Sequence, residues 1–233
     1  MIKECIKKLS FGEDLNFDLA TSAMEDIMSG DATEAQIGAF VTALSVKGET
    51  PNEIAGMAEV MRSKSLQVKS DYPLVDTCGT GGDASNSFNI STASAFVVAG
   101  AGVKVAKHGN RAMSGSSGSA DVLEALGANI DLGPDSVEEC LNQTGFGFMF
   151  AQKFHPSMKF AAAPRKEIGI RTVFNILGPL TNPAQAEYQL IGASDKNIAK
   201  KMIEVLKILK SKHSIVVCGE DGLDEISLSG STH

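Results

Sequence analysis

Three glycine- and hydroxyl-rich segments of this sequence carry residue types that bind phosphate. Gly79 to Asp83 has glycines at three of its five positions, so its backbone can turn tightly and bring N–H groups against an anion. Asn89 to Thr92 directly precedes an apolar run, and a helix N-terminus there would favour phosphate. Ser114 to Ser119 contains only serine and glycine and directly precedes the expected helix from Ala120 to Leu126. Each segment alone also fits an ordinary turn, N-cap or linker, but three in succession predict a phosphate site.

Charged residues near these segments extend the prediction. Lys107-His108-Gly109-Asn110-Arg111 follows an expected strand, where open α/β sheets bind ligands. Asp224-Glu225 follows the last expected strand and suits Mg²⁺, which one or two carboxylates hold together with substrate phosphates. Arg165 suits bidentate pairing with a substrate carboxylate. Each of these groups also has an ordinary interpretation. The Lys107 segment fits a solvated basic loop, Asp224-Glu225 fits a pair of acids in a turn, and Arg165 fits a surface arginine.

Several common phosphate and hydrolase motifs are disfavoured. The sequence has no G-x-x-x-x-G-K-[ST] motif, which argues against a P-loop NTPase. Gly79-x-Gly81-x-x-Ala84 fits the dinucleotide fingerprint poorly. The following helix is expected to begin only at about Ser91, and the second strand leads into Lys107-His108 instead of an acidic residue. No G-x-S-x-G elbow with its triad order is present. The residues therefore favour a Mg²⁺-dependent enzyme acting on a phosphate-bearing small molecule.

Composition narrows the class of protein further. The 233 residues include 28 acidic and 21 basic side chains, a formal net charge of −7, which argues against nucleic acid or an anionic membrane as partner. The 23 glycines are about a tenth of the chain, above the ~7% norm. Four dispersed cysteines suggest reduced thiols. With no secretory signal and no apolar run of membrane-spanning length, a cytoplasmic protein is expected.

Hydrophobic spacing predicts a helical segment followed by alternating strands and helices. Up to about residue 66 the pattern is helical throughout, with Thr33 as an expected helix cap and Pro51 in the first turn of another expected helix. After it come the expected strands, Leu74–Thr77, Val103–Ala106, Phe146–Phe150, Tyr188–Ile191 and Ile215–Cys218. Helices are expected between them, with short helices across the proline-punctuated stretch 156–183. Such alternation is typical of an α/β fold with a mainly parallel central sheet.

Together these motifs resemble the anthranilate phosphoribosyltransferase family. The matching segments are Asp76-x-x-Gly79-Thr-Gly-Gly-Asp83, Asn89-x-Ser91-Thr92, Lys107-His-Gly-Asn-Arg111, Gly118-Ser119-Ala-Asp121, Asn175-x-Leu177-Gly-Pro-Leu-Thr-Asn-Pro183 and Asp224-Glu225. The resemblance implies a small all-helical N-terminal domain beside a larger α/β domain, a type shared with pyrimidine nucleoside phosphorylases. It implies a helical domain over residues 1–68, joined by part of 164–184, an α/β domain over 69–233, and a homodimer through the helical domains.

The resemblance also implies a reaction of tryptophan biosynthesis: phosphoribosyl pyrophosphate and anthranilate give N-(5-phosphoribosyl)anthranilate and pyrophosphate. The implied phosphoribosyl pyrophosphate residues are Gly79, Gly82, Asp83, Ser87, Asn89, Ile90, Ser91, Thr92, Lys107 and Ser119. The implied anthranilate residues are Gly79, His108, Asn110 and Arg165, and the implied Mg²⁺ ligands are Ser91, Asp224 and Glu225. No general base is assigned, because the anthranilate amine is already a usable nucleophile.

Two departures from the family pattern leave alternatives open. The family often has Lys where this chain has Ser116. Family members run roughly a hundred residues longer, so a chain truncated at its C-terminus is expected. The alternatives are an inactive fragment or interaction module, and a sister nucleoside phosphorylase or phosphoribosyltransferase with another acceptor.

Overall fold

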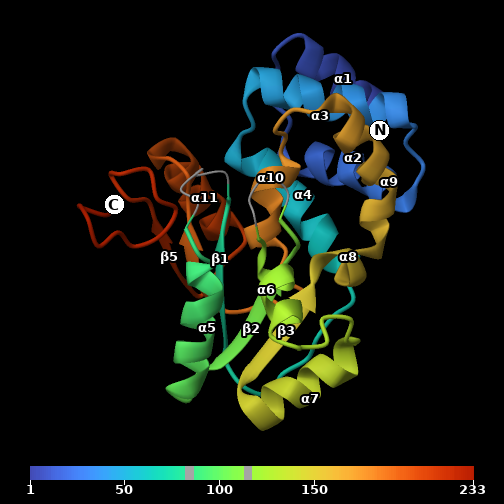
Figure 1. Cartoon of the computed structure of the whole chain (residues 1–233). Coiled ribbons are helices and arrows are strands. Elements are labelled where there is room, and N and C mark those ends of the chain that lie inside the picture. Colours follow the sequence, from blue (N-terminus) through green and yellow to red (C-terminus); the bar gives the residue numbers. More distant parts are fainter. Residues whose placement is uncertain (82–86, 113–116) are drawn as a thin grey trace. The chain divides into compact units, whose positions relative to one another are not determined.

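The computed structural model describes residues 1–81, 87–112 and 117–233, which fall into two compact units (Figure 1). The helical unit comprises Met1–Ser65, His155–Thr181 and Glu204–Lys210, and the sheet unit comprises Leu66–Phe154, Asn182–Ile203 and Ser211–His233. Each unit is thus assembled from separate stretches of sequence. Among the described residues, no helix combines the length and apolar character needed to span a bilayer.

The helical unit is built on four successive N-terminal helices. These are α1 (Ile2–Ser10), α2 (Phe17–Ser29), α3 (Glu34–Lys47) and α4 (Pro51–Ser63), and the later pieces are η1 (Pro156–Met158), α9 (Lys159–Ile168), α10 (Phe174–Leu177) and η2 (Gly178–Leu180). Thr33 and Thr50 close capping boxes at α3 and α4, which confirms the predicted cap at Thr33. Helices α2 and α4 approach so closely that a Cβ atom at Gly56 would lie 2.5 Å from the Phe17 carbonyl oxygen.

A buried imidazole makes the helical unit sensitive to acid. His155 is only 5% exposed, and burial lowers its pKa to about 4, against the opposing effect of hydrogen bonds with the backbone of Thr181 and Met61. In the unfolded chain a histidine pKa is about 6.5. Between these two pH values the imidazole is protonated in the unfolded state but neutral in the folded state. The contribution to the free energy of unfolding that is present above pH ~6.5 is therefore lost as the pH falls towards ~4.

We expect this residue to lower the free energy of unfolding by about 2 kcal/mol between about pH 7 and about pH 5. Urea unfolding at the two pH values measures the loss. In a His155→Gln variant the loss should be much smaller, because no titrating imidazole remains. Equal losses in the two proteins would contradict the assignment.

Over its described residues, the sheet unit contains five parallel strands in the order β3-β2-β1-β4-β5, in agreement with the mainly parallel central sheet that the sequence predicts. The strands are β1 (Leu74–Gly79), β2 (Lys104–Gly109), β3 (Phe146–Phe150), β4 (Tyr188–Gly192) and β5 (His213–Val217). Its described helices are α5 (Ile90–Gly100), α6 (Ser119–Ala125), α7 (Pro134–Thr144), α8 (Ala151–Phe154) and the part of α11 (Lys196–Ile208) up to Ile203.

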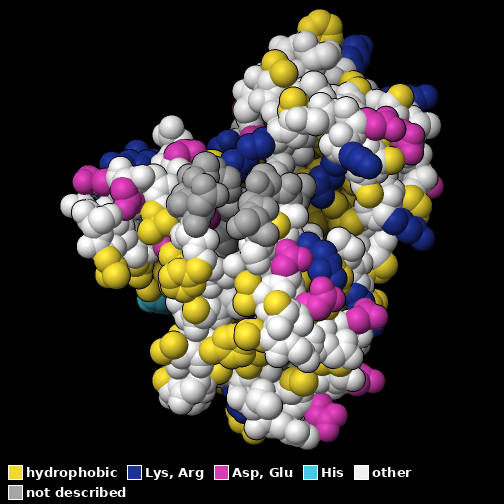
Figure 2. Space-filling view, viewed as in Figure 1, with side chains coloured by type: hydrophobic (Ala, Val, Ile, Leu, Met, Phe, Trp, Pro, Cys, Tyr) yellow, Lys and Arg dark blue, Asp and Glu magenta, His cyan; other side chains and the backbone are white. Residues whose placement is uncertain are grey.

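Helices cover both faces of this sheet, as parallel strands require. Successive residues of β3 point to opposite faces. Met149 packs with Val137 of α7 in one buried cluster, whereas Phe148 packs with Leu123 of α6 in another. Helix α5 lies against β3 through the stacked rings of Phe96 and Phe146, whose centroids are 4.7 Å apart. Figure 2 shows hydrophobic side chains gathered on the surface over α5.

The second strand is longer than its hydrophobic pattern indicates. The expected strand ended at Ala106, and Lys107 and His108 were expected in a loop, but β2 continues to Gly109 and buries both side chains. Strand β1 likewise continues past Thr77 to Gly79. Polar residues at a strand end resemble a loop in sequence. Here they remain in the ladder because the neighbouring strand supplies partners for them.

Candidate active site

The order of the strands reverses between β1 and β4. These strands are neighbours in the sheet, although β2 and β3 come between them in the chain. Open α/β sheets bind ligands at the carboxyl ends of the strands that flank such a reversal. Gly79 ends β1 there and is paired with Gly192, which ends β4. The predicted phosphate loop therefore begins at the edge where a ligand is expected.

Asp224 packs against both glycines, with its carboxylate against Gly79 and its backbone against Gly192. A Cβ atom at Gly79 would lie 2.7 Å from Asp224 Oδ2, and one at Gly192 would overlap the backbone carbonyl of Asp224. The backbone N–H of Gly81 donates to Asp224 Oδ2 at 3.2 Å. The predicted glycine loop and the predicted metal ligand are thus in direct contact. At both glycines the close approach leaves no room for a side chain.

A structured loop presents Asp224 and its neighbour Glu225. Backbone hydrogen bonds between Cys218 and His233 close the loop at its ends. Inside it, the Asp221 carboxylate accepts the hydroxyls of Ser227 at 2.6 Å and Ser229 at 2.7 Å. These hydrogen bonds lower the pKa of Asp221 to about 2. Asp221 is therefore charged at neutral pH and organises the segment that carries Asp224.

Lys107 is a buried cation at the same edge of the sheet. Its side chain is 2% exposed, and its Nζ donates to the Thr77 carbonyl oxygen and, at 3.1 Å, to Ser91 Oγ. Burial lowers the pKa of Lys107, and the nearby charges of Asp76 and Glu225 oppose that shift. Two residues that the resemblance assigns to phosphoribosyl pyrophosphate, Lys107 and Ser91, are thus joined by a hydrogen bond.

Asp76 is a buried carboxyl group that interacts electrostatically with Lys107. It is fully buried in β1 and accepts the side-chain amide of Asn182 at 2.8 Å and the backbone N–H of His108 at 3.4 Å. The same Asn182 amide donates to the Ala106 carbonyl at 2.8 Å. Burial raises the pKa of Asp76, whereas Lys107 and these hydrogen bonds act to lower it. Asn182 therefore links the acid of β1 to β2, the strand that carries Lys107.

The N-terminal turn of α5 faces the same strands. The Thr77 hydroxyl donates to the Ser91 carbonyl at 2.9 Å, which fixes the start of α5 on β1. The first turn of α5 contains no acidic residue, so none of its own side chains neutralises the positive end of the helix dipole. Thr92 is buried, and its hydroxyl has no hydrogen-bond partner among the described residues. This turn is suited to an anion.

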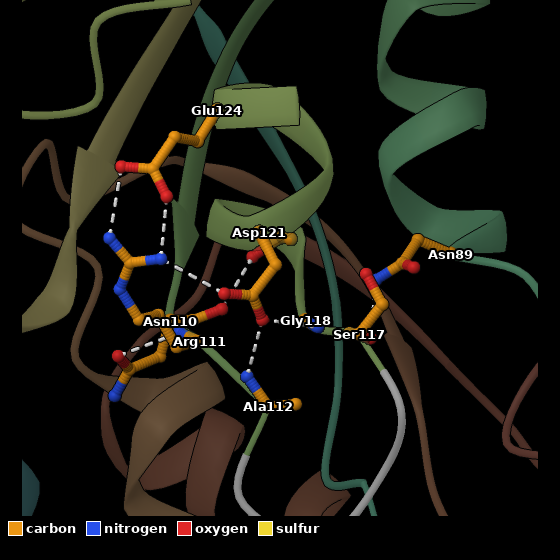
Figure 3. Close-up of polar contacts among 9 residues, drawn as sticks. Asn89, Asn110, Arg111, Ala112, Ser117, Gly118, Asp121 and Glu124 are labelled. Carbon is orange, nitrogen blue, oxygen red and sulfur yellow. Dashed lines mark hydrogen bonds and ion pairs between the residues drawn. The ribbon is translucent and has the colours of Figure 1, made fainter. Parts of the chain in front are cut away.

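Asn89 does not cap α5 with its side chain. Its Nδ2 instead donates to the Ser117 carbonyl at 3.2 Å, in the segment before α6 (Figure 3). There the Ser119 hydroxyl donates to the Asn110 carbonyl at 3.3 Å. The structure therefore joins the expected site residues Asn89, Asn110 and Ser119 through the chain around Ser117.

The remaining expected residues are placed as follows. His108 lies in β2, 9% exposed, and Ile90 opens α5. Arg165 lies on α9 of the helical unit, where its guanidinium stands 4.8 Å from the Phe174 ring centre and burial lowers its pKa. Ser87 is exposed just before α5. Gly82, Asp83 and Ser116 lie outside the described residues.

The donor set at the sheet edge fits Mg²⁺. Ser91, Asp224 and Glu225 offer the oxygen ligands that this ion accepts. Over residues 1–81, 87–112 and 117–233, no group of three or more His, Cys, Asp or Glu side chains could hold a metal ion by itself. Proteins usually hold Mg²⁺ through one or two carboxylates together with the phosphates of a substrate.

Sequence reasoning gave no role to Asp76, Asn182 or Asp221. A carboxylate within the apolar run Leu74-Val75-Asp76 was the available signal, because a charged residue is rarely buried in a strand without a partner. Asn182 is 106 residues from Asp76 in sequence, and no local pattern connects them. Asp221 resembled an ordinary turn acid, since its serine partners follow within the same polar loop.

The chain is similar to known proteins over most of its length. Residues 71–233 match the model of the glycosyl transferase family a/b domain, and residues 3–65 match that of the family's helical bundle domain. The chain is 59% identical over 229 residues to an anthranilate phosphoribosyltransferase of Roseiflexus sp. (strain RS-1), covering 98% of this chain and 67% of the relative. It is also 59% identical over 230 residues to the anthranilate phosphoribosyltransferase of Dehalococcoides mccartyi (strain CBDB1), and this match covers 99% of this chain and 67% of that relative.

Solved structures show the same likeness. The crystal structure of anthranilate phosphoribosyltransferase from Thermus thermophilus has a TM-score of 0.91 at 44% identity, covering 96% of this chain and 68% of that one. The Saccharomyces cerevisiae enzyme, in complex with PRPP and Mg, has a TM-score of 0.89 at 30% identity, covering 97% and 68%. The chain spans about two thirds of the length of these relatives. On this match of fold, motifs and sequence, the chain belongs to the anthranilate phosphoribosyltransferase family.

Proposed function

We propose that this chain transfers the phosphoribosyl group of phosphoribosyl pyrophosphate to anthranilate, forming N-(5-phosphoribosyl)anthranilate and pyrophosphate. One observation carries the proposal beyond family membership. At the carboxyl edge of the sheet, Asp224 contacts the glycine loop at Gly79 and Gly81, and Lys107 contacts Ser91 at the start of α5. A polyphosphate at this edge would meet a cation, backbone N–H groups and Mg²⁺ ligands at once.

The substrate contacts are proposed residue by residue. Phosphoribosyl pyrophosphate would be held by Gly79, Gly82, Asp83, Ser87, Asn89, Ile90, Ser91, Thr92, Lys107 and Ser119. Anthranilate would be held by Gly79, His108, Asn110 and Arg165. The domain division is proposed as residues 1–68 with part of 164–184, and 69–233. A homodimer through the helical domain and a cytoplasmic location complete the proposal.

Mg²⁺ would be held by Ser91, Asp224 and Glu225 together with the substrate phosphates. When bound, the ion neutralises phosphate charge and stabilises pyrophosphate as it departs. The complex of the yeast relative with PRPP and Mg supports this part of the proposal.

The chain's own residues would act mainly by charge and orientation. Displacement at the ribose C1 leaves positive charge on the sugar and negative charge on the departing pyrophosphate. The Lys107 ammonium is held by Thr77 and Ser91, so it would meet that negative charge without having to reorganise. The anthranilate amine carries its own lone pair, and side chains of the acceptor site would orient it towards C1. As the C1–N bond forms and the C1–O bond to pyrophosphate breaks, the amine gives up one proton to water or to the departing pyrophosphate, so no side chain is assigned as general base.

Loss of anthranilate fluorescence tests the proposal. This chain is incubated with phosphoribosyl pyrophosphate, Mg²⁺ and anthranilate. Separate reactions contain other aromatic amines or nucleobases in place of anthranilate, and a further reaction contains thymidine and phosphate. Consumption of anthranilate in preference to the other acceptors is the expected result. Turnover of thymidine with phosphate, and none of anthranilate, would assign the chain to a sister activity. No turnover of any acceptor would leave the reaction unsupported for a chain of this length.

A further inference from the structure

Asp121 holds together the two sides of the connection between β2 and α6 (Figure 3). Its Oδ2 accepts the backbone N–H of Ala112 at 2.9 Å and that of Gly118 at 2.8 Å. Its Oδ1 accepts Arg111 Nη1 at 3.0 Å. One carboxylate on α6 thus binds a residue before and a residue after the undescribed stretch 113–116.

Arg111 completes this arrangement. Its two terminal nitrogens donate to the two carboxylate oxygens of Glu124, at 2.7 and 3.1 Å, and its guanidinium lies 5.7 Å from the Phe150 ring centre. Hydrogen bonds to Glu124 and Asp121 raise the pKa of Arg111, and hydrogen bonds from Ala112 and Gly118 lower the pKa of Asp121. All three side chains are therefore charged at neutral pH.

The same two sides of the connection are packed without space for side chains. A Cβ atom at Gly118 would lie 2.6 Å from the Asn110 carbonyl oxygen, and one at Gly109 would overlap Ser119 Oγ. The Asn110 carbonyl accepts the backbone N–H of Ala120 at 3.2 Å. Asn110, proposed to contact anthranilate, and Ser119, proposed to contact phosphoribosyl pyrophosphate, therefore have a fixed separation.

We propose that Asp121, with Arg111 and Glu124, is a positioning cluster that sets Asn110 and Ser119 in the geometry in which they receive the two substrates. The inference rests on the proposed function for its substrates, but the cluster itself is defined by contacts of this chain alone. Asp121 itself contacts neither substrate in this proposal. It acts through the backbone of Ala112 and Gly118.

Hydrogen exchange tests the contacts of the positioning cluster without any substrate. In an Asp121→Ala variant the amides of Ala112 and Gly118 should lose protection, because their acceptor is gone, whereas amides of β1 and β3 should exchange as before. Asp135→Ala, which removes an exposed carboxylate from the first turn of α7, is the matched control and should change neither amide. Unchanged exchange at Ala112 and Gly118 in Asp121→Ala would show that Asp121 does not hold these two backbone groups. That result would overturn the positioning cluster whether or not the chain is an enzyme.

Kinetics tests the positioning role. Asp121→Ala should raise the KM for phosphoribosyl pyrophosphate about tenfold, as expected for losing charge-assisted hydrogen bonds, with a smaller change in kcat. Arg111→Lys, which loses the paired contact with Glu124, should give an intermediate KM. If Asp121→Ala melts globally, Asp121→Asn replaces it in both experiments. Asparagine has one acceptor oxygen, so it cannot accept the Ala112 and Gly118 amides on one oxygen and Arg111 on the other, and we expect a partial loss of protection and a smaller rise in KM. Altered amide exchange with an unchanged KM would overturn the positioning role, whereas an inactive wild-type chain would count against the proposed function and leave the exchange test intact.

Discussion

Replacing Lys107 by methionine is expected to lower kcat/KM for phosphoribosyl pyrophosphate by about a hundred- to a thousandfold. The substitution keeps the length and apolar stem of the side chain but removes the ammonium that contacts Ser91 and Thr77. Removing one fixed donor aimed at developing negative charge costs catalysis about this much in well-studied enzymes. Steady-state kinetics with anthranilate fluorescence measures the effect.

Lys200→Met is the matched control for this variant. Lys200 is exposed on α11, so the same chemical change there should leave kcat/KM within about twofold of the wild type. Thermal melting separates lost chemistry from lost folding, because Lys107→Met also leaves Asp76 buried without its cationic neighbour. A folded Lys107→Met protein with wild-type kinetics would contradict the role given to this lysine.

The double variant Asp224→Asn with Glu225→Gln is expected to lower turnover and the dependence on Mg²⁺ together. Both substitutions preserve side-chain size, and the amide introduced by Asp224→Asn keeps an oxygen that can accept the Gly81 N–H, so the loop should keep its position. They remove the two negative charges proposed to hold the ion, so half-maximal activity should require at least about tenfold more Mg²⁺.

Glu220→Gln provides the comparison for this double variant. Glu220 lies in the same loop and pairs with His233, so the substitution removes a carboxylate without touching the proposed ligands. Its Mg²⁺ titration should overlay that of the wild type. If the double variant also gave an unchanged titration, the assignment of Asp224 and Glu225 to the metal would be wrong.

Much of the fold follows from local sequence. The capping residue Thr33 and the first-turn proline Pro51 mark helix starts that the structure confirms. The alternation of short apolar runs with helical periods predicted the parallel sheet. These signals are readable because they depend on residues within one or two turns of each other.

The interior of the candidate site was less predictable. Lys107 and His108 had the composition of a solvated loop, yet they lie within β2 and are buried. Their burial depends on Asp76 and Asn182, which come from distant parts of the chain. Hydrophobic periodicity carries no information about such long-range polar pairs. The individual substrate contacts came from resemblance to a family, and they remain predictions.

The stoichiometry of the reaction is the most direct test of the proposed phosphoribosyl transfer to anthranilate. Pyrophosphate release and anthranilate consumption are measured in one reaction mixture that contains this chain, phosphoribosyl pyrophosphate and Mg²⁺. We expect one pyrophosphate to be released for each anthranilate consumed, and neither change when Mg²⁺ is chelated. Pyrophosphate release that is independent of anthranilate, or anthranilate consumption without pyrophosphate, would contradict it.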